Sequence, residues 1–374
     1  MALRAVALVG VLLFTSACSD VAETSADPTP TPVGTSTPTA AASKSASAVA
    51  SRPADAPDNR PGLLVAVIRP SGPLELRRVD RTTHRSTTVR ALEAPVDGAQ
   101  VIDVAMADGP EPVICASWHL TPGPVFDDLE TALTCYPWGS SRGSGIANVE
   151  RPIEIALTSA GTRIAWSLAT EGESNPIFST AMLSDGQVAD IVRRRGQAAE
   201  SDDAFTGRDI QDLAWTDNSH LAVSTSVQSD DGPELFHVDV DGEPGRGWLQ
   251  DAPVVPGPTD SGYTTYDGVR SAGATTALAR KRGYSLAGEG ERPPDQAVRI
   301  DVASGRVLQV LATAAEGRNL INVSGTEEAV LYVTGDFGGD GGTDAKAYLR
   351  LPGESRGTLI TGLPADFETV VAQG

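Results

Sequence analysis

Positive charge is scarce in this sequence. Its 374 residues contain 29 lysines and arginines against 49 aspartates and glutamates, which gives a formal net charge of −20. Nucleic acids are bound through positively charged side chains that neutralise the phosphates. We therefore expect no nucleic-acid partner, and no adhesion of the folded body itself to anionic lipid.

Histidine and long apolar runs are scarce as well. The four histidines are His84, His119, His220 and His237, and no two of them have metal-ligand spacing. One apolar run covers residues 5–14, but a membrane-spanning helix needs about 20 residues. No later segment is long and apolar enough to cross a membrane, and none shows a sustained helical period. The sequence therefore argues against a histidine metal centre and against a helical domain.

The first 17 residues have the pattern of an export signal. Arg4 is the only charge, residues 5–14 are apolar, and small residues follow up to Ala17. Cys18 comes next, and this arrangement resembles the lipobox of bacterial lipoproteins, although Thr15 replaces the usual leucine. The resemblance implies cleavage before Cys18, lipidation of its sulfur, and a position on the outer face of the cytoplasmic membrane. The alternative is an ordinary secretory signal with a chance cysteine.

Residues 18–61 contain no aromatic side chain and consist mainly of Ser, Thr, Ala, Pro and Asp. Such a segment buries too little apolar area to offset the entropy of ordering it. We expect a disordered tether that holds the folded body, residues 62–374, away from the membrane. The body would then contact the membrane only through the lipid anchor.

The other two cysteines are expected to form a disulfide. Residues 112–118 and 131–138 are predicted strands, and the loop between them is centred near residue 125. Facing residues in an antiparallel hairpin have a constant index sum, so Cys115 and Cys135 should lie opposite each other. An exported protein reaches an oxidising compartment. Two buried free thiols are the alternative.

Two strand patterns alternate along the body. One is a hairpin with a glycine-containing turn, and the other is an apolar strand, a short polar turn and a second apolar strand. Together they give four short strands per unit of 50–58 residues, which is the signature of a β-propeller blade. The hairpins cover 74–92, 133–149, 178–192, 235–249, 297–311 and 347–360, and the second pattern covers 101–118, 153–167, 210–224, 320–334 and, in degraded form, 269–280.

The two ends of the body are expected to share a blade. The first unit, 63–92, has only three strands, and residues 366–372 supply one spare strand at the end of the chain. Pairing them would close the ring and leave no free sheet edge. We therefore predict an all-β fold, a six-bladed β-propeller, with seven blades possible if residues 250–296 contain further strands.

The segments IAWS (164–167), LAWT (213–216) and LAVS (221–224) resemble the WD40-like repeats of TolB-type propellers. That family includes periplasmic and envelope scaffolds that bind other proteins. The resemblance implies the propeller fold. We expect a monomeric, non-catalytic protein whose partner is an envelope protein or an extracellular ligand. We expect the five tryptophans to pack between blades; they are Trp118, Trp138, Trp166, Trp215 and Trp248.

The connections between the second and third strands of the blades should emerge on one face of the propeller. Many of them are acidic, which predicts either a binding face around the channel or ordinary solvated loops. The candidate acids are Asp127, Asp128, Glu171, Glu173, Asp230, Asp231, Glu289, Glu291, Asp336, Asp340 and Asp344. Asp336, Asp340 and Asp344 could also offer oxygen ligands to Ca²⁺, but their spacing does not match an EF-hand loop.

The alternative function is enzymatic. Six-bladed propellers can be metal-dependent hydrolases or lactonases that use carboxylates and asparagine in the central channel. Asp103, Glu154, Asp212 and Asn322 lie on the predicted innermost strands and could point into that channel. About half of all innermost side chains would do so in any propeller, so we assign no catalytic residue and leave the metal unknown.

Overall fold

The computed structural model of the protein describes residues 62–372 with several gaps. The gaps are 110, 121–129, 147–148, 169–176, 185–186, 196–207, 228–233, 243–252, 256–262, 274, 285–292, 316–317, 327 and 337–343. The predicted signal and tether, residues 1–61, lie outside the described residues. Within the described part no helix is long and apolar enough to span a membrane.

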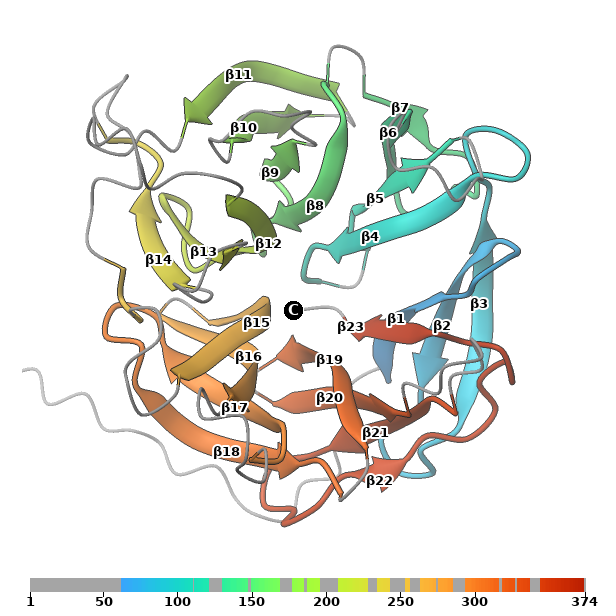
Figure 1. Ribbon diagram of the computed structural model, residues 1–374. Helices are drawn as coiled ribbons and strands as arrows, with labels where there is room; N and C mark the ends of the chain where they lie inside the picture. Colours follow the sequence, from blue (N-terminus) through green and yellow to red (C-terminus); the bar gives the residue numbers. More distant parts are fainter. Residues whose placement is uncertain are drawn as a thin grey trace, which may run out of the picture. The chain divides into compact units, whose positions relative to one another are not determined.

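The described strands form six small antiparallel sheets arranged in a ring (Figure 1). The predicted six-bladed β-propeller is therefore confirmed, and the region 250–296 contributes one blade rather than two. The first three blades contain β1 (Leu63–Ile68), β2 (Leu74–Val79), β3 (Ser86–Leu92), β4 (Gln100–Met106), β5 (Ile114–His119), β6 (Thr131–Tyr136), β7 (Ser144–Gly145), β8 (Pro152–Leu157), β9 (Arg163–Leu168), β10 (Ile177–Ser184) and β11 (Gln187–Arg195). The last three contain β12 (Arg208–Trp215), β13 (His220–Val227), β14 (Glu234–Asp239), β15 (Tyr263–Gly273), β16 (Thr276–Tyr284), β17 (Gln296–Asp301), β18 (Val307–Thr313), β19 (Asn319–Thr326), β20 (Ala329–Gly335), β21 (Lys346–Arg350) and β22 (Thr358–Leu359).

The ring closes as the sequence predicts. The final strand, β23 (Thr369–Ala372), pairs antiparallel with β1 and becomes the innermost strand of blade one. The register places Val65 opposite Ala372 and Ile68 opposite Thr369. A strand from the end of the chain thus completes the sheet formed by the beginning of the body, so the inner edge of β1 is paired.

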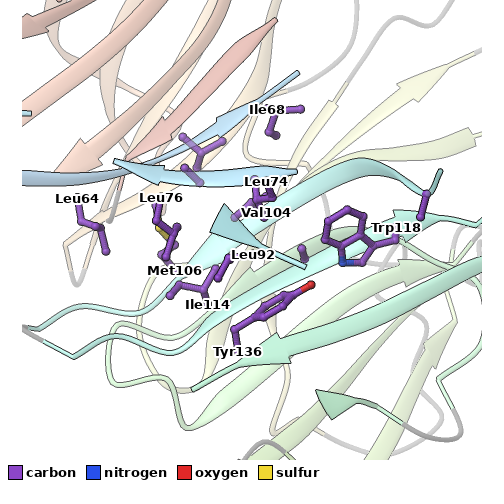
Figure 2. Close-up of a cluster of buried hydrophobic side chains, with 14 residues drawn as sticks. Leu64, Ile68, Leu74, Leu76, Leu92, Val104, Met106, Ile114, Trp118 and Tyr136 are labelled. Carbon is purple, nitrogen blue, oxygen red and sulfur yellow. The ribbon is translucent and has the colours of Figure 1, made fainter. Parts of the chain in front are cut away.

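The apolar core lies between the blades, in six clusters that each join two neighbours. Strand β1 shows why its sequence, LLVAVI, is apolar throughout. Alternate side chains of a strand point to opposite faces, so Leu64 and Ala66 pack toward blade two while Val65 and Val67 pack toward blade six. Figure 2 shows the first of these clusters, where Trp118 and Tyr136 of blade two lie beside the leucines of blade one.

The tryptophan and disulfide predictions are also confirmed within the described residues. Trp118, Trp166 and Trp215 are buried in three successive inter-blade clusters, and Trp138 packs against the first of them. Trp248 lies outside the described residues. Cys115 and Cys135 face each other across the β5–β6 hairpin and form a disulfide.

Candidate functional site: the mouth of the central channel

One strand of each blade faces the centre of the ring: β4, β8, β12, β15, β19 and β23 (Figure 1). Where these strands begin, they enclose a cavity of about 210 Å³, which we call the mouth cavity. Its polar lining includes Asp103, Glu154, Asp212, Asp267, Arg270 and Asn322. Farther along the strands the lining becomes mainly apolar, for example at Val104, Ile155 and Leu213.

Arg270 reaches across the channel. It belongs to β15 in blade five, and its guanidinium forms a bidentate ion pair with Asp103 on β4 in blade two, the opposite blade of the ring. The Nη2–Oδ1 distance is 2.7 Å and the Nη1–Oδ2 distance is 3.3 Å. Burial alone would lower the pKa of Arg270, but the carboxylates of Asp103, Asp212 and Glu154 outweigh that effect and raise it. A permanently charged guanidinium therefore links blade five to blade two across the channel.

Three of the predicted channel residues also connect neighbouring blades. Inner strands of adjacent blades belong to different sheets, so part of their backbone needs side-chain partners. Oδ2 of Asp103 accepts a hydrogen bond from the Ile155 amide at 2.9 Å. Nδ2 of Asn322 donates to the Val370 carbonyl at 2.9 Å. Much of the polarity of the inner strands is therefore structural.

The third connection depends on a glycine. Oδ2 of Asp212 accepts a hydrogen bond of 2.6 Å from the amide of Gly268. Gly268 has a φ of +61° and lies in an irregularity of the β15–β16 ladder. Glycine adopts this backbone conformation without the strain that other residues incur. The irregularity thus turns a backbone donor toward the channel.

The mouth cavity changes the protonation of two carboxyl groups. Burial raises the pKa of Asp212 to about 7, although the nearby Arg270 opposes the change. Burial and the negative charges of Asp103 and Asp212 raise the pKa of Glu154 well above its usual range. Asp212 therefore changes its charge near neutral pH.

The acids predicted to form a binding face mostly lie outside the described residues. That applies to Asp127, Asp128, Glu171, Glu173, Asp230, Asp231, Glu289, Glu291 and Asp340. The strands that lead to these segments do end at the channel mouth, because His119 of β5 pairs with Gln100 and Val227 of β13 pairs with Arg208. Both β5 and β13 therefore end at the same face of the propeller, the face of the channel mouth.

Asp336 and Asp344 are described, and both face positive side chains. An oxygen of Asp344 lies 3.3 Å from Nη1 of Arg318 and 3.1 Å from Nζ of Lys346. Asp336 is 3.6 Å from the same Arg318 nitrogen. These carboxylates are thus paired within the protein rather than grouped around an empty centre, and the calcium prediction gains no support from them.

The channel carboxylates do not form a chelating group either. Among the described residues, no three His, Cys, Asp or Glu side chains are grouped so that they could hold a metal ion. Asp103 uses both carboxylate oxygens for Arg270 and for backbone amides. A divalent cation at this place would have to displace a buried arginine.

The arginines of the mouth cavity were not identified from the sequence. Arg270 lies in the degraded copy of the repeat, and Arg280, on β16, hydrogen-bonds to Asp267 and to the Ile321 carbonyl. The available signal was two arginines, Arg270 and Arg280, within the degraded copy of the repeat at 269–280. A buried charge in such a strand usually has a charged partner.

No protein-family model matches the sequence, and no curated protein is similar to it. Solved structures do resemble it. TolB from Acinetobacter baumannii has a TM-score of 0.50 and 12% identity over 83% of this chain, which corresponds to 66% of TolB. A putative TolB from Agrobacterium tumefaciens gives 0.49 and 11% identity, over 84% of this chain and 99% of that one.

A puromycin-hydrolyzing peptidase from Mycobacterium tuberculosis gives a TM-score of 0.46 and 12% identity, over 80% of this chain and 45% of that one. At such identities the likeness concerns the fold alone. The match to the Acinetobacter structure supports this likeness of fold. The likeness agrees with the resemblance seen in the repeats. The described body is therefore a six-bladed β-propeller whose fold is similar to that of TolB.

Proposed function

We propose that this protein is a non-catalytic binding protein of the cell envelope, and that its propeller binds a protein or another ligand at the channel mouth. The mouth cavity carries the proposal, because side chains of all six blades converge on it. The connections between second and third strands leave at the same end. Recognition is commonly performed by loops and pockets that a rigid scaffold positions.

The location is inferred from the first part of the chain. We propose that Cys18 is lipidated and that residues 18–61 tether the propeller to the outer face of the cytoplasmic membrane. The disulfide between Cys115 and Cys135 supports export, since such bonds persist in oxidising compartments.

Replacing Cys18 with alanine should release the protein from the membrane fraction into the soluble extracytoplasmic fraction. The anchor supplies the membrane affinity in this proposal, and the acidic body supplies none. Cell fractionation followed by immunoblotting measures the distribution. A Cys18→Ala protein that remains fully membrane-bound would contradict the lipid anchor.

The hydrolase alternative is less well supported. A metal-dependent hydrolase needs carboxylates that are free to bind the ion, and Asp103 is instead engaged by Arg270. Glu154 and Asp212 remain available, but they share the cavity with that buried guanidinium. The arrangement favours recognition of a ligand over activation of a water molecule.

The binding proposal can be tested by crosslinking in intact cells, followed by affinity purification and mass spectrometry. Asp209 and Gln211 are exposed on β12 near the mouth, and Gln211 lines the cavity. The double variant Asp209→Arg/Gln211→Arg should reduce capture of the partner at least tenfold, because it adds bulk and positive charge at the mouth.

The matched control places two arginines on the opposite face. Asp108 and Glu111 are exposed in the turn between β4 and β5, and Asp108→Arg/Glu111→Arg should leave capture unchanged. Equal capture by wild type and the mouth variant would move the binding site away from the channel. Loss of capture in the control variant alone would place it on the opposite face.

A further inference from the structure

The carboxylates of the mouth cavity are not equally compensated. Asp103 is paired with Arg270, and Asp267 accepts a hydrogen bond from Arg280. Glu154 and Asp212 have no ion-pair partner of their own within the part of the chain that the structure describes. The cavity thus contains two acids whose charge no neighbouring cation neutralises individually.

Of these two acids, Asp212 gives the stronger indication of a ligand, because it is only 8% exposed. Oδ2 accepts the Gly268 amide, whereas Oδ1 has no hydrogen-bond partner among the described residues. Asn322 is 7% exposed and uses Nδ2 for the Val370 carbonyl, which leaves its Oδ1 as a further acceptor. Neither oxygen belongs to the fully enclosed, unpaired polar atoms of the described residues, so both can be reached from the cavity. Two acceptors without a protein donor beside one cavity point to a ligand that donates hydrogen bonds.

The remainder of the lining suits a carbon chain. Ile68, Ile102, Ile321 and Val371 complete the wall of the cavity. Its volume of about 210 Å³ exceeds the roughly 150 Å³ that suffices for a benzene-sized molecule. The cavity can therefore hold a small organic group as well as water.

We propose that the mouth cavity binds a primary ammonium group, with Asp212, Glu154 and Asn322 as its acceptors. An ammonium group has three donors and one positive charge, which matches three acceptors and an excess of negative charge. The isoleucines would contact the attached carbon chain. The inference rests on the proposed binding function and names the class of ligand.

A divalent metal ion fits the same residues less well. Short metal–oxygen bonds require a close group of ligands, and the described carboxylates form no such group. The neighbouring guanidinium of Arg270 would also repel a dication more strongly than a single positive charge.

The test is isothermal titration calorimetry of the full-length protein with n-butylammonium chloride at pH 8. We expect saturable binding at one site, and no binding of 1-butanol, which has the same carbon chain without the charge. Asp212→Asn should weaken the binding at least tenfold. Asparagine retains an oxygen acceptor for the Gly268 amide, so the fold is expected to persist, and circular dichroism checks this.

The matched control is Asp190→Asn. Asp190 is exposed on the outer strand β11 and has a φ of +53°, a conformation that asparagine also tolerates. This variant removes the same charge far from the channel, so its affinity for butylammonium should equal that of wild type. Equal weakening in both variants would show a general charge effect and overturn the site.

The affinity should also depend on pH. Asp212 faces the Gly268 amide, Asp267, Arg270, Arg280 and Glu154, and its pKa of about 7 predicts roughly tenfold tighter binding at pH 8 than at pH 6. Butylammonium remains charged throughout this range. The Asp212→Asn variant should lose most of this dependence.

Two further probes distinguish the sources of the group. Nα-acetyl-lysine methylamide carries the ammonium of a lysine side chain, and glycine methylamide carries that of a peptide N-terminus. Binding of the first alone indicates a lysine of a partner, and binding of the second alone indicates a chain terminus. Binding of butylammonium with neither indicates a small free amine.

Three results would overturn the proposal: no binding of any of the amines, equal binding of 1-butanol, or displacement of butylammonium by stoichiometric Ca²⁺. The proposed function can survive each of them. If the crosslinked partner is still lost in the mouth variant, the binding function stands and only the ligand class is wrong.

Discussion

Replacing Arg270 with methionine is expected to lower the free energy of unfolding by about 3–5 kcal/mol at pH 8. Methionine has a similar length and retains much of the packing, but it leaves Asp103 buried without its bidentate partner. Asp103 is 4% exposed, so little solvent can replace the lost charge. Breaking a buried ion pair on one side costs far more than removing an exposed one.

The pH dependence of this loss identifies its cause. The pKa of Asp212 is raised to about 7, so Asp212 is mostly protonated at pH 5 and mostly ionised at pH 8. Arg270 therefore compensates more negative charge at pH 8 than at pH 5. The stability difference between wild type and Arg270→Met should grow as the pH rises through about 7, the pKa of Asp212.

Urea unfolding of the full-length protein, followed by tryptophan fluorescence at pH 5 and pH 8, measures both effects. Arg142→Met is the control, because Arg142 is 83% exposed and pairs with an exposed glutamate; we expect no measurable change. A loss in Arg270→Met that is identical at the two pH values would show that packing, not charge, explains the destabilisation.

The fold could be predicted because its determinants are local. The apolar run of β1 and the alternation of β2 report directly which faces are buried. The pairing of Cys115 with Cys135 follows from the length of one hairpin. The closing strand was recognised because blade one lacks a fourth strand in its own sequence. Each of these inferences needs only neighbouring residues or simple counting.

Blade five shows where this reasoning fails. The repeat appeared degraded around residues 269–280, yet β15 and β16 form a long hairpin of 11 and 9 residues. The irregularities at Asp267–Arg270 and Ser271–Gly273 break the alternation on which the pattern depends. The same residues bring Gly268 and Arg270 into the channel. The functional candidate is therefore also the place where the repeat is hardest to recognise.

The pairing of Arg270 with Asp103 could not be predicted, because these residues are 167 positions apart. They meet only because blades two and five lie opposite each other in a closed ring of six. The four inner-strand residues named from the sequence, Asp103, Glu154, Asp212 and Asn322, do line one cavity. Their division into structural and available groups depends on hydrogen bonds between blades, which a single strand pattern does not contain.

Deleting residues 366–374 is expected to have the largest effect on stability. Strand β23 contributes Val370, Val371 and Ala372, which are at most 5% exposed, and Phe367 precedes it with 7% exposure. Burying two valines and a phenylalanine contributes on the order of 5 kcal/mol or more. Deletion also removes the partner strand of β1. We therefore expect the melting temperature to fall by about 10 °C or more.

Calorimetry or thermal circular dichroism measures the change, and deletion of residues 373–374 alone is the control because it leaves β23 intact. A synthetic peptide of residues 366–374 should restore stability to the truncated chain, whereas a scrambled peptide should not. An unchanged melting temperature after the long deletion would contradict closure by β23.

Thr369 and Val371 line the mouth cavity, and the Val370 carbonyl accepts a hydrogen bond from the Asn322 side-chain amide. Because ring closure also builds the cavity, butylammonium binding should disappear with the strand and return with the peptide.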